Sequence, residues 1–189
     1  GGERHVQIDE TTLVSLSGKV LVRAQMTSSQ DVMDYLLLEN ILLNQGLTVD
    51  VEIPYFPYAR QDRICAVGQA FSLDVMTKLL NINADKKAGK QGKVTVWDCH
   101  SEVTTALLAT NTSFKEVINV SSVEIIKKSE ALSELLKDEK TVLICPDKGA
   151  KARTQMVADA FNIERKQPIT VIQCDKKRDP VTGKILGTH

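Results

Sequence analysis

Short apolar runs alternate with helical stretches along most of the chain, and this alternation restricts the possible folds more than any other feature. Runs such as 142–145 are apolar throughout, which is typical of strands whose two faces are both covered. The pattern predicts an α/β fold with a largely parallel sheet flanked by helices and joined by right-handed crossovers. Strands are expected at 6–8, 19–24, 48–53, 93–97, 117–120, 141–145 and 169–174, and helices from the N-cap candidates at 28–31 to Gly46 and at 72–80, 101–109, 123–136 and 149–161.

Polar clusters follow four of the expected strands, directly at their carboxyl ends. In parallel α/β sheets, ligands bind beyond these ends. We therefore expect the functional residues to come from separate crossover units and to meet at one rim of the sheet. The four clusters are 60–63 (Arg-Gln-Asp-Arg), 98–100 (Asp-Cys-His), 147–149 (Asp-Lys-Gly) and 176–178 (Lys-Lys-Arg).

The segment 54–63, Pro-Tyr-Phe-Pro-Tyr-Ala-Arg-Gln-Asp-Arg, follows the expected strand 48–53. Its two prolines fix φ and remove two backbone donors, so neither a helix nor a strand ladder can continue through it. Guanidinium groups bind phosphates bidentately and aromatic rings stack on bases, which favours a site for a nucleotide polyphosphate. On chemistry alone, a solvated turn whose aromatics cap the core explains the segment equally well.

This decamer closely resembles the ATP-binding loop of the ribose-phosphate diphosphokinases, also called phosphoribosyl pyrophosphate synthetases. The resemblance implies that Arg60, Gln61, Asp62 and Arg63 bind ATP and that Tyr58 shapes the loop. It also implies a phosphoribosyltransferase-like, Rossmann-like fold. An ATP-binding domain would cover 1–136, and the first part of a second, similar domain with the catalytic flexible loop would cover 137–189.

The segments around His100 and Asp147 resemble two further motifs of the family. Asp98-Cys99-His100 resembles the Asp-Leu-His segment, which implies that His100 contacts the triphosphate or a Mg²⁺-bound water, with direct metal ligation possible. The run 146–150, Pro-Asp-Lys-Gly-Ala, resembles the Pro-Asp-x-Gly-Gly turn, and this implies a role for Asp147 in binding Mg²⁺. The alternative for each carboxylate is an ordinary helix N-cap, beside a surface histidine in the first case.

The cluster 176–178 and the first residues complete the resemblance. Taken alone, Lys176-Lys177-Arg178 belongs to an ordinary charged surface hairpin, but it keeps the Lys-x-Arg spacing of the family's flexible loop. That spacing implies that Lys176 and Arg178 neutralise charge on the transferring group. Glu3 resembles the glutamate of the family's Phe-x-x-Gly-Glu segment, which contacts adenine across a subunit interface. A homo-oligomer, dimer-based and possibly hexameric, is expected on that ground.

Composition excludes several classes of partner. Lys+Arg and Asp+Glu balance at 24 each, so no overall charge favours binding to nucleic acid or to a membrane surface.

The four cysteines lie far apart without a Cys-x-x-Cys pair, as is typical of reduced thiols in a cytoplasmic protein. The chain opens and stops inside recognisable motifs, so we expect a piece of a longer protein that lacks the ribose 5-phosphate loop.

The expected activity is transfer of the diphosphoryl group of MgATP to the C1 hydroxyl of ribose 5-phosphate, which gives AMP and 5-phosphoribosyl 1-diphosphate. The resemblance implies this reaction, with Mg²⁺ as cofactor and nucleotide biosynthesis as its setting. Three alternatives remain open: a catalytically silent homologue that regulates the active enzyme, a phosphoribosyltransferase of similar fold, and a non-enzymatic α/β interaction module.

Overall fold

The computed structural model of the protein describes residues 2–84, 88–178 and 185–188. Its contacts divide the chain into two compact units, Gly1–Val120 and Ser121–His189, which are treated separately below. The contact-based division lies earlier than the domain boundary expected after residue 136, which stays a prediction. It lies earlier because the helices that follow Val120 contact α7 (Lys151–Asn162) of the second unit.

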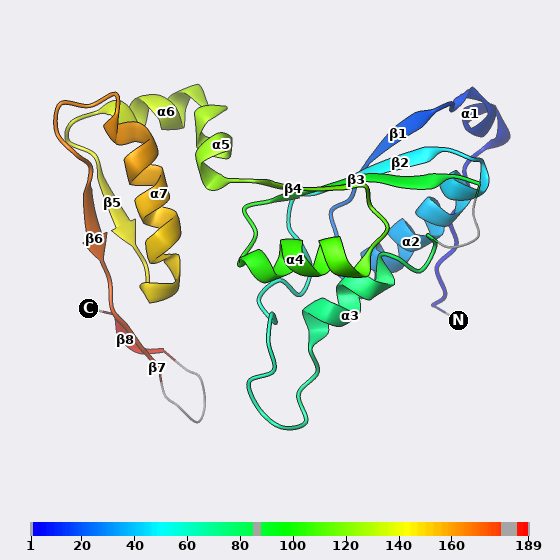
Figure 1. Cartoon of the computed structure of the whole chain (residues 1–189), viewed down its shortest axis with the longest axis horizontal. Helices are drawn as coiled ribbons and strands as arrows, with labels where there is room; N and C mark the ends of the chain where they lie inside the picture. Colours follow the sequence, from blue (N-terminus) through cyan, green and yellow to red (C-terminus); the bar gives the residue numbers. More distant parts are fainter. Residues whose placement is uncertain (1, 85–87, 179–184, 189) are drawn as a thin grey trace. The chain divides into compact units, whose positions relative to one another are not determined.

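The first unit is an α/β domain built on one parallel sheet. Its strands stand in the order β1-β2-β3-β4, the same as their order in the sequence, and all three pairings are parallel. Figure 1 shows α2, α3 and α4 on one side of this sheet. The predicted parallel α/β fold is thus confirmed. The elements are α1 (Glu10–Ser15), β1 (Lys19–Arg23), α2 (Ser29–Asn44), β2 (Thr48–Ile53), α3 (Ser72–Leu79), β3 (Lys90–Trp97), α4 (Glu102–Asn111) and β4 (Glu116–Val120).

The two faces of this sheet differ in chemistry. The helix-covered face carries the fully buried side chains Val51, Ile53, Val94 and Val96, which form the core with residues of the helices. Successive residues of a strand point to opposite faces. Most of the alternate residues of β1 and β2 are charged, and two ion pairs join the strands: Lys19 with Asp50 at 3.3 Å and Arg23 with Glu52 at 2.9 Å. These cross-strand ion pairs lie on the second face of the two strands, on either side of the exposed Leu21.

Local signals in the sequence set the ends of α2. Ser28 is the N-cap, and its side chain accepts a hydrogen bond from the Asp31 amide while the Asp31 side chain accepts from the Ser28 amide. Such a capping box satisfies backbone donors that the helix leaves unpaired. Gly46 follows the C-cap with φ +79, a left-handed conformation that glycine adopts without strain. Both predicted boundaries of this helix are confirmed.

The second unit has a two-stranded parallel sheet and a separate antiparallel pair. Helix α7 contacts both β5 and β6, and α6 contacts α7 (Figure 1). A small core of Leu136, Val157, Ala158, Phe161 and Ile169 joins these elements. The elements are α5 (Ser122–Lys127), α6 (Glu130–Lys137), β5 (Val142–Cys145), the 3₁₀ helix η1 (Lys148–Ala150), α7 (Lys151–Asn162), β6 (Thr170–Gln173), β7 (Lys176–Arg178) and β8 (Ile185–Thr188).

Two sequence predictions differ from the structure. The expected helix 123–136 is two helices, because Ser129 starts α6 as its N-cap and its side chain accepts from the Leu132 amide. The expected strand 6–8 is extended but joins no sheet among the described residues. The charged segment 176–178, interpreted from the sequence as part of a surface hairpin, is strand β7, and its antiparallel pairing with β8 agrees with that interpretation.

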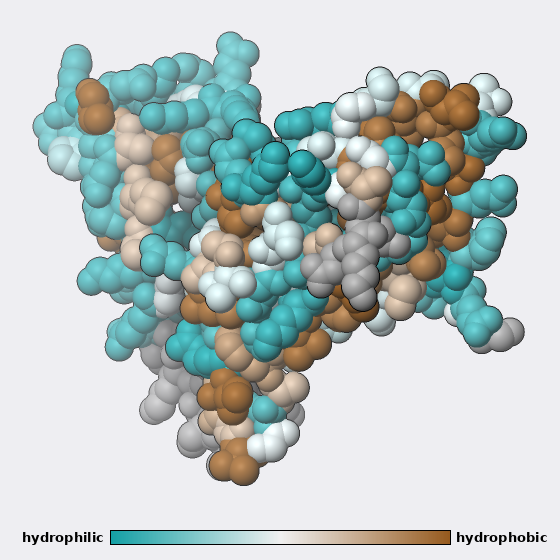
Figure 2. Space-filling model, turned by 45° about the vertical axis from the view of Figure 1, so that its right-hand side comes forward, coloured by the Kyte–Doolittle hydropathy of each residue, from teal (hydrophilic) through white to brown (hydrophobic). Residues whose placement is uncertain are grey.

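No helix within the described ranges is long and apolar enough to cross a membrane. Figure 2 shows hydrophobic and hydrophilic side chains interspersed on the face that it presents.

Candidate functional site

The loops that follow β2 and β3 meet around one cavity in the first unit. In Figure 1 the first of these is the long trace that runs between β2 and α3. The cavity has a volume of about 550 Å³ and lies at the carboxyl ends of two neighbouring strands. The expectation that clusters 60–63 and 98–100 come together is therefore confirmed in position. The lining residues are Arg60, Gln61, Asp62, Arg63, Cys65, Gln69, Ala70, Ser72 and His100.

The aromatic part of the loop divides between the core and the surface. Phe56 is 3% exposed and belongs to the hydrophobic core, so for this ring the core-capping interpretation is correct. Tyr55 and Tyr58 are 60% and 45% exposed. Tyr58 has φ +61, an outlier for a bulky residue, and its carbonyl accepts a hydrogen bond from the Gln61 amide at 2.9 Å. This turn at Tyr58 redirects the chain just before Arg60.

Gln61 attaches the loop to the start of α3. Its side-chain Oε1 accepts a hydrogen bond from the Ser72 hydroxyl at 2.6 Å, and its carbonyl accepts from the Leu73 amide at 3.4 Å. The N-cap residue of α3, Phe71, provides no side-chain cap. Gln61 therefore satisfies a backbone donor at this helix end, and the attachment restrains the cavity wall next to Arg60.

Asp62 is buried beneath the loop and joins it to the start of α4. Its side chain is 4% exposed, whereas the paired Arg63 side chain is 71% exposed. Arg63 donates through Nε to Oδ1 at 2.8 Å and through Nη2 to Oδ2 at 3.2 Å, and the Ser101 hydroxyl donates to Oδ2 at 2.7 Å. These hydrogen bonds, first that from Arg63 and then that from Ser101, lower the pKa of Asp62 to about 2.

The lowered pKa of Asp62 predicts an acid-dependent loss of stability. Because the folded value lies below the unfolded value of 3.8, the contribution is complete above about pH 4 and disappears as the pH falls through about 2. We expect D62N to lower the free energy of unfolding by about 2 kcal/mol at pH 7, and the difference from the parent to shrink between pH 4 and pH 2. The free energy of unfolding is measured at each pH by urea titration, with the fluorescence of the single tryptophan, Trp97, as the signal.

E116Q is the control for this prediction, since it removes a half-exposed ion pair with Lys93 in the same unit. Surface pairs contribute about 0–1 kcal/mol. An equal loss for D62N and E116Q at pH 7 would contradict a special contribution from the buried carboxylate.

His100 reaches the cavity through an unusual turn after β3. Asp98 has φ +44, in the left-handed region where aspartate is several times more frequent than most residues. Its amide donates to the Val120 carbonyl at 2.8 Å, and the Cys99 amide donates to Asn119 Oδ1 at 3.2 Å. Both contacts fix the turn to the end of β4, so the exposed His100 is presented by a well-supported segment.

The charges of the cavity suit an anion. Arg60, Arg63 and His100 can all donate hydrogen bonds to phosphate oxygens, and the carboxylate of Asp62 already accepts from Arg63 and Ser101. No group of three or more His, Cys, Asp or Glu side chains able to hold a metal occurs within the described residues. Mg²⁺ binds proteins through one or two carboxylates together with substrate phosphates. The residues therefore fit Mg²⁺ delivered with a polyphosphate better than a cage of protein ligands.

The other predicted site residues lie in the second unit, except Glu3, which lies near the start of the first unit. Asp147 is the N-cap of η1, and its Oδ1 accepts from the Ala150 amide at 3.1 Å, so the N-cap alternative is correct for this side chain. Lys176 and Arg178 lie on β7, but their side chains are outside the described part of the structure. The metal role of Asp147 and the catalytic roles of Lys176 and Arg178 stay predictions.

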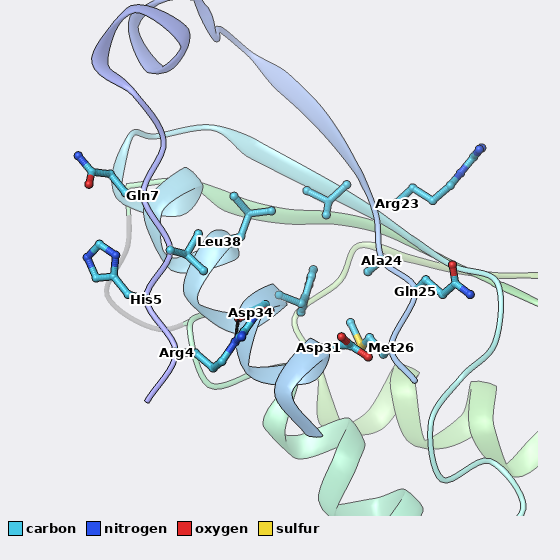
Figure 3. Close-up of a pocket in the computed structure, with 13 residues that line it drawn as sticks. Arg4, His5, Gln7, Arg23, Ala24, Gln25, Met26, Asp31, Asp34 and Leu38 are labelled. Atoms are coloured by element: carbon cyan, nitrogen blue, oxygen red, sulfur yellow. Dashed lines mark hydrogen bonds and ion pairs between the residues drawn. The ribbon is translucent and has the colours of Figure 1, made fainter. Parts of the chain in front are cut away.

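Glu3 is exposed and is not among the residues that line the 550 Å³ cavity. Its neighbour Arg4 donates through Nε to Asp34 of α2 at 2.7 Å, and this pair holds the first residues against the helix. Figure 3 shows the pair at the edge of a second cavity of about 480 Å³, between the segment 4–7 and the end of β1. The predicted adenine contact of Glu3 crosses a subunit interface, so it also stays a prediction.

Sequence reasoning missed Ser101 and the contributions of Cys65, Gln69 and Ser72 to the site. Ser72 and Ser101 were expected only as the first residues of helices. The available signal was position: Ser72 follows the loop after β2, and Ser101 follows the turn at the end of β3. Their partners lie 11 and 39 residues away in the sequence, which no local pattern specifies.

Comparison with known proteins finds similar sequences in several organisms. A ribose-phosphate pyrophosphokinase of Thermococcus kodakarensis is 27% identical over 168 residues, which cover 86% of this chain and 52% of that protein. Ribose-phosphate pyrophosphokinase 1 of Listeria monocytogenes is 28% identical over 181 residues, which cover 94% and 50% of the two chains. The chain thus spans about half the length of the curated relatives that it matches. No family model matches the chain.

Comparison with solved structures finds a protein with a similar fold. The crystal structure of phosphoribosylpyrophosphate synthetase from Mycobacterium smegmatis superposes with a TM-score of 0.65 at 19% identity, and the match covers 89% of this chain and 50% of that one. The phosphoribosyltransferase-type fold expected from the sequence is confirmed.

Proposed function

Because the chain is a homologue of the ribose-phosphate pyrophosphokinases and shares their fold, we propose that it binds the triphosphate of MgATP in the 550 Å³ cavity. We further propose that the protein transfers the β,γ-diphosphoryl group to ribose 5-phosphate. The observation that carries the proposal is the convergence of Arg60, Arg63 and His100, from two strand ends, on one cavity. The names of the relatives support this reaction class, whereas a non-enzymatic module would not require such a site.

In the proposed reaction, the C1 hydroxyl oxygen of ribose 5-phosphate forms a bond to the β-phosphorus. The bond from that phosphorus to the oxygen shared with the α-phosphorus breaks, the oxygen leaves on AMP, and the hydroxyl proton is released. Catalysis of such transfers depends mainly on positioning and on neutralising charge. Arg60 and Arg63 hold phosphate oxygens, and His100 binds the triphosphate or a water of its Mg²⁺. Mg²⁺ supplies further charge neutralisation.

The residues of the second unit have proposed roles in the same reaction. Lys176 and Arg178 neutralise charge on the diphosphoryl group during transfer, and Asp147 binds the Mg²⁺ that accompanies ATP. Glu3 contacts adenine in a neighbouring subunit of a homo-oligomer. Single turnover of the full-length K176A protein tests the first role, since a rate within a few-fold of the full-length parent would remove it.

Calorimetric titration of this chain with MgATP, together with a ³¹P NMR assay of the full-length protein with ribose 5-phosphate, tests the proposal. We expect saturable binding at one site per chain and, in the full-length protein, the appearance of AMP together with a diphosphate ester. Binding without turnover would favour the catalytically silent homologue. A chain that binds no MgATP in the presence of Mg²⁺ would contradict the proposal and favour the interaction module.

A further inference from the structure

Ser101 occupies the N-cap position of α4 but does not cap the helix. At such positions a serine oxygen normally accepts a hydrogen bond from an amide of the first turn. Here no such bond is formed by the Ser101 side chain, and only its carbonyl accepts from the Thr104 amide, at 3.3 Å. The hydroxyl instead donates to Asp62 Oδ2 at 2.7 Å. The Ser101 side chain thus forms its hydrogen bond with a residue 39 positions away in the sequence instead of with its own helix.

The Asp62 carboxylate transmits this contact to Arg63. One of its oxygens accepts from Arg63 Nε, and the other accepts from both Arg63 Nη2 and the Ser101 hydroxyl. A bidentate pair of this kind fixes the plane of the guanidinium as well as its position. Since the carboxylate is buried and the arginine side chain is 71% exposed, the pair is anchored at the aspartate end.

Without this anchor, the Arg63 side chain would sample many rotamers. An exposed arginine loses conformational freedom when it binds a ligand, and a guanidinium that is already oriented loses less. Arg63 lines the cavity, whereas Ser101 does not. The Ser101 hydroxyl therefore acts on a bound phosphate through its hydrogen-bond partner Asp62 rather than by direct contact.

We propose that Ser101 is a positioning residue for phosphate binding: its hydroxyl orients the Asp62 carboxylate, which in turn holds the Arg63 guanidinium toward the cavity. This role rests on the proposed function, because it assigns the arginine to the triphosphate of MgATP. The proposed role explains why Ser101 does not cap α4 with its side chain. It also explains why a buried carboxylate, Asp62, lies beside a cavity suited to anions.

A double-mutant cycle between Ser101 and Arg63 tests the proposal. We expect S101A to raise the dissociation constant for MgATP about ten-fold, the size expected when a hydrogen bond to a charged group is lost. S101T, which keeps the hydroxyl, should bind nearly as well as the parent. In an R63A background S101A should have little further effect, because its partner guanidinium is already gone. A full ten-fold loss in that background would overturn the proposal, since a merely structural role would persist.

T105A is the matched control, because Thr105 is on the same helix and its hydroxyl donates to the Glu102 carbonyl rather than to Asp62. We expect it to leave MgATP binding unchanged. The NMR resonance of Arg63 Nε provides a readout that does not require ATP. It should shift and exchange faster with solvent in S101A but not in T105A, and an unchanged resonance would also overturn the proposal. If the parent chain binds no MgATP, the proposed function fails while this resonance still decides whether Ser101 orients Arg63.

Discussion

Removal of both guanidiniums from the cavity should abolish measurable affinity for MgATP at micromolar concentrations. Arg60 and Arg63 lie three residues apart on the loop after β2, and both line the 550 Å³ cavity. Each hydrogen bond to a charged phosphate contributes about 1.5–3 kcal/mol, so we expect R60A/R63A to weaken binding by about 3–6 kcal/mol, roughly 100-fold or more. Isothermal titration calorimetry of the parent, the two single variants and the double variant measures this loss.

The control is R23A, which removes an arginine that pairs with Glu52 outside this cavity. Electrostatic attraction at a distance would make R23A weaken binding as well, and raised salt would reduce the difference. A double variant that binds MgATP within three-fold of the parent would remove the cavity as the triphosphate site. Because R63A also deprives the buried Asp62 of a partner, the thermal midpoint of each variant should be recorded alongside its affinity.

A second large effect is expected in the core of the second unit. Phe161 is 1% exposed and is the largest member of a cluster of five buried residues. Truncation of a buried phenylalanine to alanine costs about 3–5 kcal/mol through lost burial and the cavity that remains. Small domains are only marginally stable, so we expect F161A to unfold much of the second unit.

Unfolding of the second unit can be distinguished from unfolding of the first, because the single tryptophan of the chain, Trp97, lies in the first unit and its fluorescence reports on that unit. F161A should lower the helical circular dichroism and expose the amides of 121–178 to hydrogen exchange, while the urea transition of Trp97 fluorescence stays near that of the parent. F161L should cost less than about 1.5 kcal/mol, since it keeps most of the volume. F114A, which truncates a buried ring of the first core, should instead shift the Trp97 transition. A joint shift of all signals in F161A would mean that the two units unfold together.

The regular parts of the fold follow from local sequence patterns, and the departures have local causes. The βα alternation, the parallel pairing and both ends of α2 were predictable, because apolar periodicity and capping residues agree there. The break in the expected helix 123–136 was missed because the apolar spacing continues across it, although Ser129 followed by Glu130 is a start signal. The hairpin interpretation of 176–178 agrees with the pairing of β7 and β8, although three charged side chains do not reveal which backbone groups pair.

The sequence indicated residues 60–63 and His100 as site residues, but it did not indicate which of them are buried or which other side chains contact them. The order of residues in 60–63 gave no indication that Asp62 is buried while its two arginine neighbours are exposed. Nor could the sequence indicate that Ser101 directs its hydroxyl to this carboxylate instead of its own helix. These features depend on contacts between segments far apart in the chain, and such contacts are determined by the packing of the β2 and β3 loops.

The sheet of the first unit has strands in the same spatial order as in the sequence. Each strand therefore pairs with the one made just before it, and no strand must wait for a distant segment to be inserted beside it. Partners in the three pairings lie 23 to 43 residues apart, and this order lowers the entropy cost of closing each loop relative to a sheet in which a later strand is inserted between two earlier ones. During translation, β1 and β2 could associate as soon as both had left the ribosome, and β3 and β4 would then extend an existing edge.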